Sequence, residues 1–195
     1  FEETKIARST LNGVRYGIPF DTGTVCAAYR TDLLREAGLT IDDMTDLTWE
    51  EWINRSRQVY QATGLPLIAV RRADADLVMM MMQSAGASIY NKENKVTFAD
   101  NEELRTCVGL YRNAVEQGAI LVVDSDSQYR NAVAKGRVVG IIGGSGTLSL
   151  VMRTQEQSGS WAVTNMPRIE ESEEAGYYAD NGASSWAVTV QCSQL

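Results

Sequence analysis

The feature that most constrains the fold of this chain is an alternation of short apolar runs with longer helical segments. Residues 66–70, 138–142 and 161–165 are apolar runs of strand length. Before the first of these runs, Thr48 and Glu51 form the capping-box pattern, which predicts a helix from there to about residue 63. Helices that alternate with short strands predict an α/β protein, in which a small mixed sheet is flanked by helices.

The composition argues against several kinds of function. The 195 residues carry a net charge of −7 and contain no histidine, so the commonest general base and the commonest zinc ligand are both missing. Lys and Arg form no cluster of the kind that binds nucleic acid. Cys26, Cys107 and Cys192 lack CxxC spacing and are expected to be small buried residues. We therefore expect no metal, no cofactor and no nucleic-acid partner.

A glycine-rich segment, residues 143–147, directly follows the strand expected at 138–142 and leads into a helix expected to end near residue 157. Glycine lets the backbone approach a ligand closely, and the first turn of a helix has N–H groups without intrahelical partners. The segment is neither a P-loop nor a GxGxxG motif. A tight turn without a ligand is the alternative interpretation. The candidate ligand-binding residues here are Gly144, Ser145, Gly146 and Thr147.

Three aspartates at the ends of expected strands are further candidates. Asp21 follows a proline-containing strand expected at 14–20, and Asp74 and Asp76 follow the strand at 66–70. Ligands of α/β proteins tend to bind beyond the carboxyl ends of the strands. A single aspartate at such a place is also a common helix cap, which is the alternative for each of them.

Methionine and tryptophan supply the remaining candidates. Met79, the first of four consecutive methionines, could face a cleft, although packing in the core is favoured for all four. Trp186 follows a Gly-Ala-Ser-Ser segment and is expected near a cleft, within a strand pair formed by residues 177–179 and 185–190. The other tryptophans lie on periodic apolar patterns and are expected in the core; they are Trp49, Trp52 and Trp161.

The order of these motifs resembles one family, the extracellular solute-binding proteins of ABC importers, of the sugar-binding type. The similarity spans nearly the whole chain. The segments that carry it are 16–23 (YGIPFDTG), 29–39 (YRTDLLREAGL), 48–52 (TWEEW), 135–140 (KGRVVG) and 161–167 (WAVTNMP).

The resemblance implies a periplasmic-binding-protein-like type II fold, in which two lobes close on a ligand by a hinge motion. Residues 1–23 would be a hinge and crossing strand of the first lobe, residues 24–167 the second lobe, and residues 168–195 a return crossing. Asp21 and Thr22 would bind ligand hydroxyls from one wall, and Asp74 and Asp76 from the other. Ser145 and Thr147 would close the floor of the site.

The same resemblance implies the partners and the location of the protein. It would capture a carbohydrate outside the cell or in the periplasm, anchored by a lipid, and deliver it without catalysis to the membrane subunits of an ABC permease. A fragment of such a protein would leave the strands of residues 176–195 without their usual neighbours. We therefore expect it to dimerise or to exchange strands.

One position departs from the family pattern. Sugar-binding members often carry a tryptophan that stacks on the sugar ring where this chain has Gly146. Trp186 or Tyr29 could replace that ring. The exposed helix N–H groups of residues 143–147 would otherwise suit a small polar or anionic solute. Two further alternatives are an enzyme domain that acts on a phosphorylated small molecule at residues 143–147, and a structural or adhesive surface domain.

Overall fold

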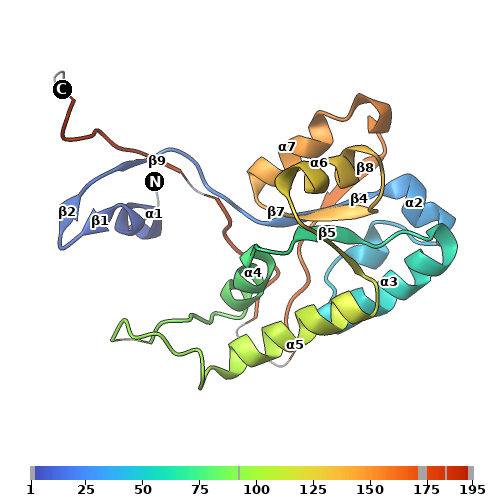
Figure 1. Cartoon of the computed structure of the whole chain (residues 1–195), viewed down its shortest axis with the longest axis horizontal. Helices are drawn as coiled ribbons and strands as arrows, with labels where there is room; N and C mark the ends of the chain where they lie inside the picture. Colours follow the sequence, from blue (N-terminus) through green and yellow to red (C-terminus); the bar gives the residue numbers. More distant parts are fainter. Residues whose placement is uncertain (1–2, 92, 171–174, 183, 193–195) are drawn as a thin grey trace.

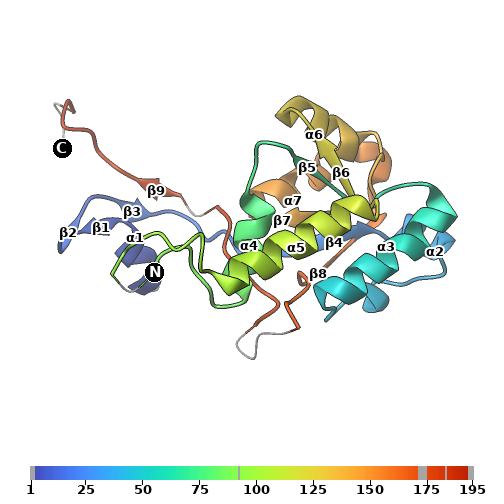
Figure 2. The same cartoon turned by 60° about the horizontal axis from the view of Figure 1, so that its bottom comes forward.

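The computed structural model describes residues 3–91, 93–170, 175–182 and 184–192 of the chain (Figures 1 and 2). Its helices are α1 (Glu3–Arg8), α2 (Thr31–Glu36), η1 (Asp42–Met44), α3 (Trp49–Thr63), α4 (Asp76–Ser84), α5 (Glu102–Glu116), α6 (Asp126–Ala134), α7 (Ser145–Met152) and η2 (Gln155–Gln157). Its strands are β1 (Thr10–Leu11), β2 (Val14–Arg15), β3 (Ile18–Pro19), β4 (Cys26–Arg30), β5 (Ile68–Arg71), β6 (Ile120–Val123), β7 (Gly140–Gly143), β8 (Trp161–Thr164) and β9 (Ser185–Trp186).

The central sheet is mixed. β4 lies between β7 and β8 and is antiparallel to both, while β5 and β6 form a parallel pair. Two backbone hydrogen bonds join these groups: Val139 N–H donates to Pro66 O at 3.1 Å, and Gly140 N–H donates to Leu67 O at 2.6 Å. The resulting spatial order is β6, β5, β7, β4, β8.

Successive residues of the central strands point to opposite faces of this sheet, as strand geometry requires. On β4, Ala27 and Tyr29 join the larger core cluster, whereas Ala28 joins the smaller one. Ile142 and Ile141 on β7 divide in the same way. Figure 1 shows α6 and α7 on one side of the sheet and α3 and α5 on the other. The predicted α/β class, with a small mixed sheet flanked by helices, is confirmed.

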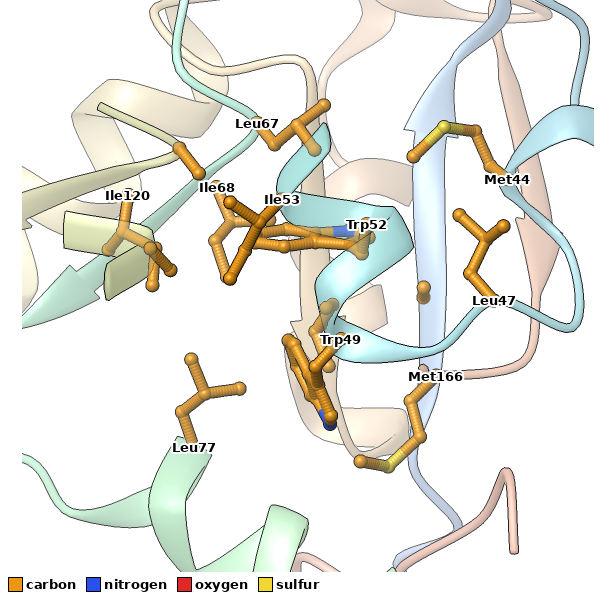
Figure 3. Packing of buried hydrophobic residues seen from close by; sticks show 14 of the residues in the cluster. Met44, Leu47, Trp49, Trp52, Ile53, Leu67, Ile68, Leu77, Ile120 and Met166 are labelled. Atoms are coloured by element: carbon orange, nitrogen blue, oxygen red, sulfur yellow. The ribbon is translucent and has the colours of Figure 1, made fainter. Parts of the chain in front are cut away.

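The larger cluster is built around two tryptophans at the start of α3 (Figure 3). The capping box predicted from the sequence is present: the Glu51 N–H donates to Thr48 Oγ1 at 3.2 Å, and the Thr48 N–H donates to Glu51 Oε2 at 2.8 Å. This cap directs Trp49 and Trp52 inward, where their rings pack edge to face with centroids 5.4 Å apart. Both are buried, as predicted. Trp161, predicted in the core, is only partly buried.

Several helix boundaries differ from the sequence prediction. Asp100, with Glu103 three residues later, is the cap that the sequence predicts for α5. The observed cap is Asn101, whose side chain accepts the Leu104 N–H at 2.9 Å. α7 ends at Met152 instead of near residue 157. The N–H groups of Arg153 and Thr154 bond to carbonyls three residues back, which closes the helix in a tighter turn. β6 was not predicted, although residues 120–123 are entirely apolar.

An arm formed by residues 3–20 and 184–192 extends away from the sheet and its helices (Figures 1 and 2). The strand expected at 14–20 is divided into β2 and β3. The strand pair expected between 177–179 and 185–190 is wrong: β9 covers only Ser185–Trp186, and its partner is β3, with Ile18 opposite Trp186. Pro19 can occupy β3 because this two-stranded pairing leaves a free edge. Cys192 is exposed, contrary to prediction, whereas Cys107 is buried.

Two structural features are absent from the described ranges. No group of three or more His, Cys, Asp or Glu side chains there could hold a metal ion. Within the same ranges, no helix has both the length and the apolar character needed to cross a membrane.

Candidate ligand-binding site

A cavity of about 460 Å³ lies where β5, β6 and β7 end. Its walls come from the β5–α4 loop, the first turn of α6, the β7–α7 junction and two segments near the arm. Apolar side chains from β5, α4, β7 and α7 form part of the wall, and charged and amide groups form the rest. The residues that line the cavity are Asp21, Ile68, Ala69, Val70, Arg71, Asp74, Asp76, Leu77, Met80, Asp126, Tyr129, Arg130, Ile142, Gly143, Gly144, Ser145, Gly146, Thr147, Leu150, Asn181, Gly182 and Ser184.

The β5–α4 loop places two carboxylates on this wall. Arg71, the last residue of β5, donates to Asp74 through Nε at 3.0 Å and through Nη2. Asp74 Oδ1 also accepts the N–H of Asp76 at 2.9 Å, so Asp74 stands at the entrance of α4. These bonds fix the direction of the loop, and they leave Asp76 at the first turn of the helix.

The pKa values of Asp74 and Asp76 are shifted in opposite directions. Burial alone would raise the pKa of Asp74, but the hydrogen bonds from Arg71 and from the Asp76 N–H outweigh it, and the pKa is lowered. The pKa of Asp76 is raised, because partial burial disfavours its charge more than a hydrogen bond from Asn181 favours it, and the nearby Asp74 adds to the rise. Asp74 is thus the firmly ionised member of the pair.

Arg71 connects the ends of the two parallel strands. Its Nη1 donates to Oδ1 of Asp126 at 3.0 Å. Asp126 is the first residue of α6, the helix that follows β6. Its guanidinium also lies 6.0 Å from the ring centroid of Tyr129. Burial raises the pKa of Tyr129 to about 12, so its hydroxyl remains a neutral donor and acceptor. Arg130, also on the cavity wall, bonds to Asp126.

The β7–α7 junction supplies the third wall. Gly144 is the N-cap of α7, and none of the described side chains caps this helix. Thr147 N–H donates to Gly144 O at 2.9 Å, whereas the N–H groups of Ser145 and Gly146 have no intrahelical acceptor. Ser145 and Gly146 are exposed here, and Thr147 packs against Gly143, where a Cβ atom would lie 2.7 Å from Thr147 Oγ1. The junction combines exposed backbone donors with two hydroxyl groups.

Asn181 is a wall residue that the sequence analysis missed. Its backbone N–H donates to Gly23 O at 2.7 Å, and Gly23 N–H donates to Asp180 Oδ1 at 3.1 Å. Its side-chain Nδ2 contacts Met80 Sδ at 3.4 Å. In the sequence, residues 180–182 indicate only a turn, because no local pattern records contact with residues far away in the chain.

The structure brings together seven of the predicted site residues and leaves three outside. Asp21, whose carboxylate accepts the Ser184 N–H, lines the cavity. So do Asp74, Asp76, Gly144, Ser145, Gly146 and Thr147. Thr22, Met79 and Trp186 do not line it.

Met79 lies outside the cavity because of the helical period of α4, and Trp186 lies outside it because of the pairing of β9 with β3. Met80, one residue after Met79, is the methionine that α4 directs toward the cavity. Trp186 is 68% exposed on the arm, where its ring meets Phe20 edge to face at 5.8 Å. Among the described residues, the aromatic side chain that lines the cavity is Tyr129, and not Trp186 or Tyr29.

Comparison with curated proteins finds relatives that bind sugars. The chain is 30% identical over 188 residues to the lactose-binding protein of Rhizobium radiobacter, covering 96% of this chain and 44% of that protein. It is 24% identical over 106 residues to the arabinooligosaccharide-binding protein of Bacillus subtilis, covering 54% of this chain and 24% of the relative. The chain thus spans less than half the length of these relatives.

Solved structures share the fold. The GacH receptor of Streptomyces glaucescens, solved unliganded and with acarbose, superposes with a TM-score of 0.81 at 18% identity, covering 100% of this chain and 49% of the receptor. A transporter-associated protein of Bifidobacterium animalis subsp. lactis in complex with β-1,6-galactobiose gives a TM-score of 0.79 at 17% identity, covering 96% of this chain and 47% of that protein. These likenesses confirm the periplasmic-binding-protein-like architecture.

The family itself is established by sequence. Residues 2–194 match the family described as bacterial extracellular solute-binding protein. The resemblance seen in the motifs is therefore confirmed across almost the entire chain, and the chain belongs to the bacterial extracellular solute-binding proteins.

Proposed function

We propose that this chain forms one wall of the sugar-binding site in a protein that captures a neutral oligosaccharide outside the cell and delivers it to an ABC permease, without catalysis. Lactose is the first candidate ligand, because the relative at 30% identity is named for binding it. The absence of histidine from the chain supports binding without chemistry.

The observation that carries this proposal is the make-up of the cavity. Sugars present hydroxyl groups around their edges and apolar C–H groups on their faces. Asp74, Asp76 and Asn181 offer acceptors and donors to hydroxyls, and Leu77 and Ile142 offer apolar contact beside them. Tyr129 adds an aromatic edge to the same wall.

The charges at the cavity favour a neutral ligand over an anion. The exposed N–H groups of residues 145–146 alone would suit an anion. Four carboxylates share the wall with them, however, and the two guanidinium groups there are engaged with Asp74 and Asp126. An anionic solute would meet unbalanced negative charge at this wall. The cavity is therefore unsuited to a small anionic solute and to a phosphorylated substrate.

We further propose the division in which residues 1–23 and 168–195 cross to a first lobe and residues 24–167 form the second. Large apolar side chains on the arm support it, because they are more than half exposed and would be covered by further chain: Leu11, Val14, Tyr16, Ile18, Phe20, Trp186, Val188 and Val190. The family description supports an extracellular or periplasmic location. We also propose that a lipid anchors the full-length protein to the membrane. The pairing of β9 with β3 gives strand exchange between copies no support.

Isothermal titration of the full-length protein tests the proposal. Lactose, an arabinooligosaccharide and glycerol 3-phosphate are each titrated at pH 7. We expect micromolar dissociation constants for at least one of the two neutral sugars and no measurable binding of the phosphate. Asp74→Asn should weaken sugar binding, and Glu93→Gln, which changes an exposed carboxylate outside the cavity, should not. Tight binding of glycerol 3-phosphate with none of either sugar would overturn the proposal.

A further inference from the structure

The peptide unit between Asn181 and Gly182 lies directly against two glycines from distant parts of the chain. A Cβ atom built on Gly144 would lie 1.9 Å from Asn181 O, and one built on Gly23 would lie 2.4 Å from the same oxygen. Apart from atoms of its own and the adjacent residues, a real Cβ atom essentially never has a heavy atom within 3.0 Å. A larger residue at either position would therefore displace the segment that carries Asn181.

Backbone conformation does not account for these two glycines. Gly144 has φ −72° and ψ 176°, extended values that any residue adopts. Gly23 is not among the glycines with positive φ. Close approach of another backbone is the remaining reason for a glycine, and here both glycines are approached by the same carbonyl group.

This contact holds the Asn181 side chain at the cavity. The backbone N–H is fixed by Gly23 O, and the amide reaches Met80 Sδ and Asp76 on the first turns of α4. A primary amide has two N–H donors and a carbonyl acceptor, and a thioether is a weak acceptor. The amide therefore has hydrogen-bonding capacity to offer to a ligand hydroxyl.

We propose that Asn181 is a ligand-binding residue, and that Gly23 and Gly144 are positioning residues whose role is to seat it. Asn181, which lies in the proposed return crossing of residues 168–195, then contacts the ligand together with the β5–α4 and β7–α7 loops. The inference rests on the proposed function for its choice of lactose as the probe.

Two measurements on the full-length protein test this assignment. The first is lactose affinity in Asn181→Ala, Gly144→Ala and the double variant. Asn181→Ala should weaken binding about tenfold, the value of a lost hydrogen bond to a ligand. Gly144→Ala should weaken it by a similar factor, and the double variant no further, because both act through the same amide. Gly109→Ala is the matched control, since Gly109 is exposed on α5 with no atom within 4 Å of an added Cβ; it should leave the affinity unchanged.

The second measurement needs no ligand. The Asn181 N–H is protected by Gly23 O, so its hydrogen exchange should accelerate in Gly144→Ala and stay unchanged in Gly109→Ala. Asn181→Ala keeps the backbone and guards against a Gly144 variant that does not fold. Unchanged lactose affinity in Asn181→Ala would overturn the binding role, and unchanged exchange in Gly144→Ala would overturn the positioning role. If the unmodified protein binds no sugar, the proposed function fails, while the exchange result still decides the positioning role.

Discussion

Tyr29 and Trp52 form a hydrogen bond inside the core, where neither group can turn to water instead. Trp52 Nε1 donates to Tyr29 Oη at 2.8 Å, and both side chains are 0% exposed. We expect Tyr29→Phe to lower the free energy of unfolding by about 1–3 kcal/mol, because the indole N–H would be left buried without an acceptor. Urea unfolding measures this change. Tyr60→Phe is the control, since Tyr60 is 52% exposed and removal of its hydroxyl should change the free energy of unfolding little. Equal stability of the two variants would contradict the prediction.

At the scale of single residues, the sequence predicted what depends on local position. Asp74 and Asp76 were identified because a carboxylate just after a buried strand is placed by the strand itself. Asn181 was missed because its place depends on Gly23 and Gly144, whose close contact with its backbone has no local signature. Trp186 was expected near the cleft because it follows a Gly-Ala-Ser-Ser sequence, yet its position follows from pairing with Ile18, which is distant in the chain.

Among the secondary-structure elements, the β4–β7 pairing depends on the absence of a side chain at Gly140. A Cβ atom there would lie 2.3 Å from Tyr29 Cδ1 and 2.7 Å from Ala28 O. Tyr29 is held by Trp52 and cannot move aside, so Gly140→Ala should destabilise the protein by about 1–3 kcal/mol, as overpacked cores do. Thermal and urea unfolding give the measurement. Gly109→Ala, in the middle of α5, should instead be neutral or stabilising by up to about 1 kcal/mol; a harmless Gly140→Ala would show that the strands can separate to admit a methyl group.

Elements with their own local signals were predicted well. The capping box fixed the start of α3, and apolar periodicity fixed its inward face. β6 was overlooked, although Gly118 separates the apolar run of residues 120–123 from the preceding helix. Residues 177–179 and 185–190 were predicted to pair with each other. The observed partners of Asp180 and Trp186 are Thr24 and Ile18, which are distant in sequence, and period and composition carry no information over such distances.

For the whole molecule, an open cavity predicts weak binding by this chain alone. A ligand held only by this wall keeps one face in water, and the gain from closure of a second lobe is lost. We expect residues 1–195 in isolation to bind lactose with a dissociation constant no tighter than about 1 mM, against the micromolar value expected for the full-length protein. Titration calorimetry of both proteins under one condition makes the comparison. Micromolar binding by the isolated chain would show that the site is complete within it.

The pairing of the central strand also has a consequence for how the chain is made. Ala28 of β4 pairs with Ile141 and Val163, both over a hundred residues later. At the usual synthesis rate of about 5–20 residues per second, β4 would wait roughly 7–27 s for its second neighbour. Sheets built from such distant pairings also form slowly. The central sheet of this chain therefore cannot be complete until residues 161–164 have been synthesised, because β8 pairs directly with β4.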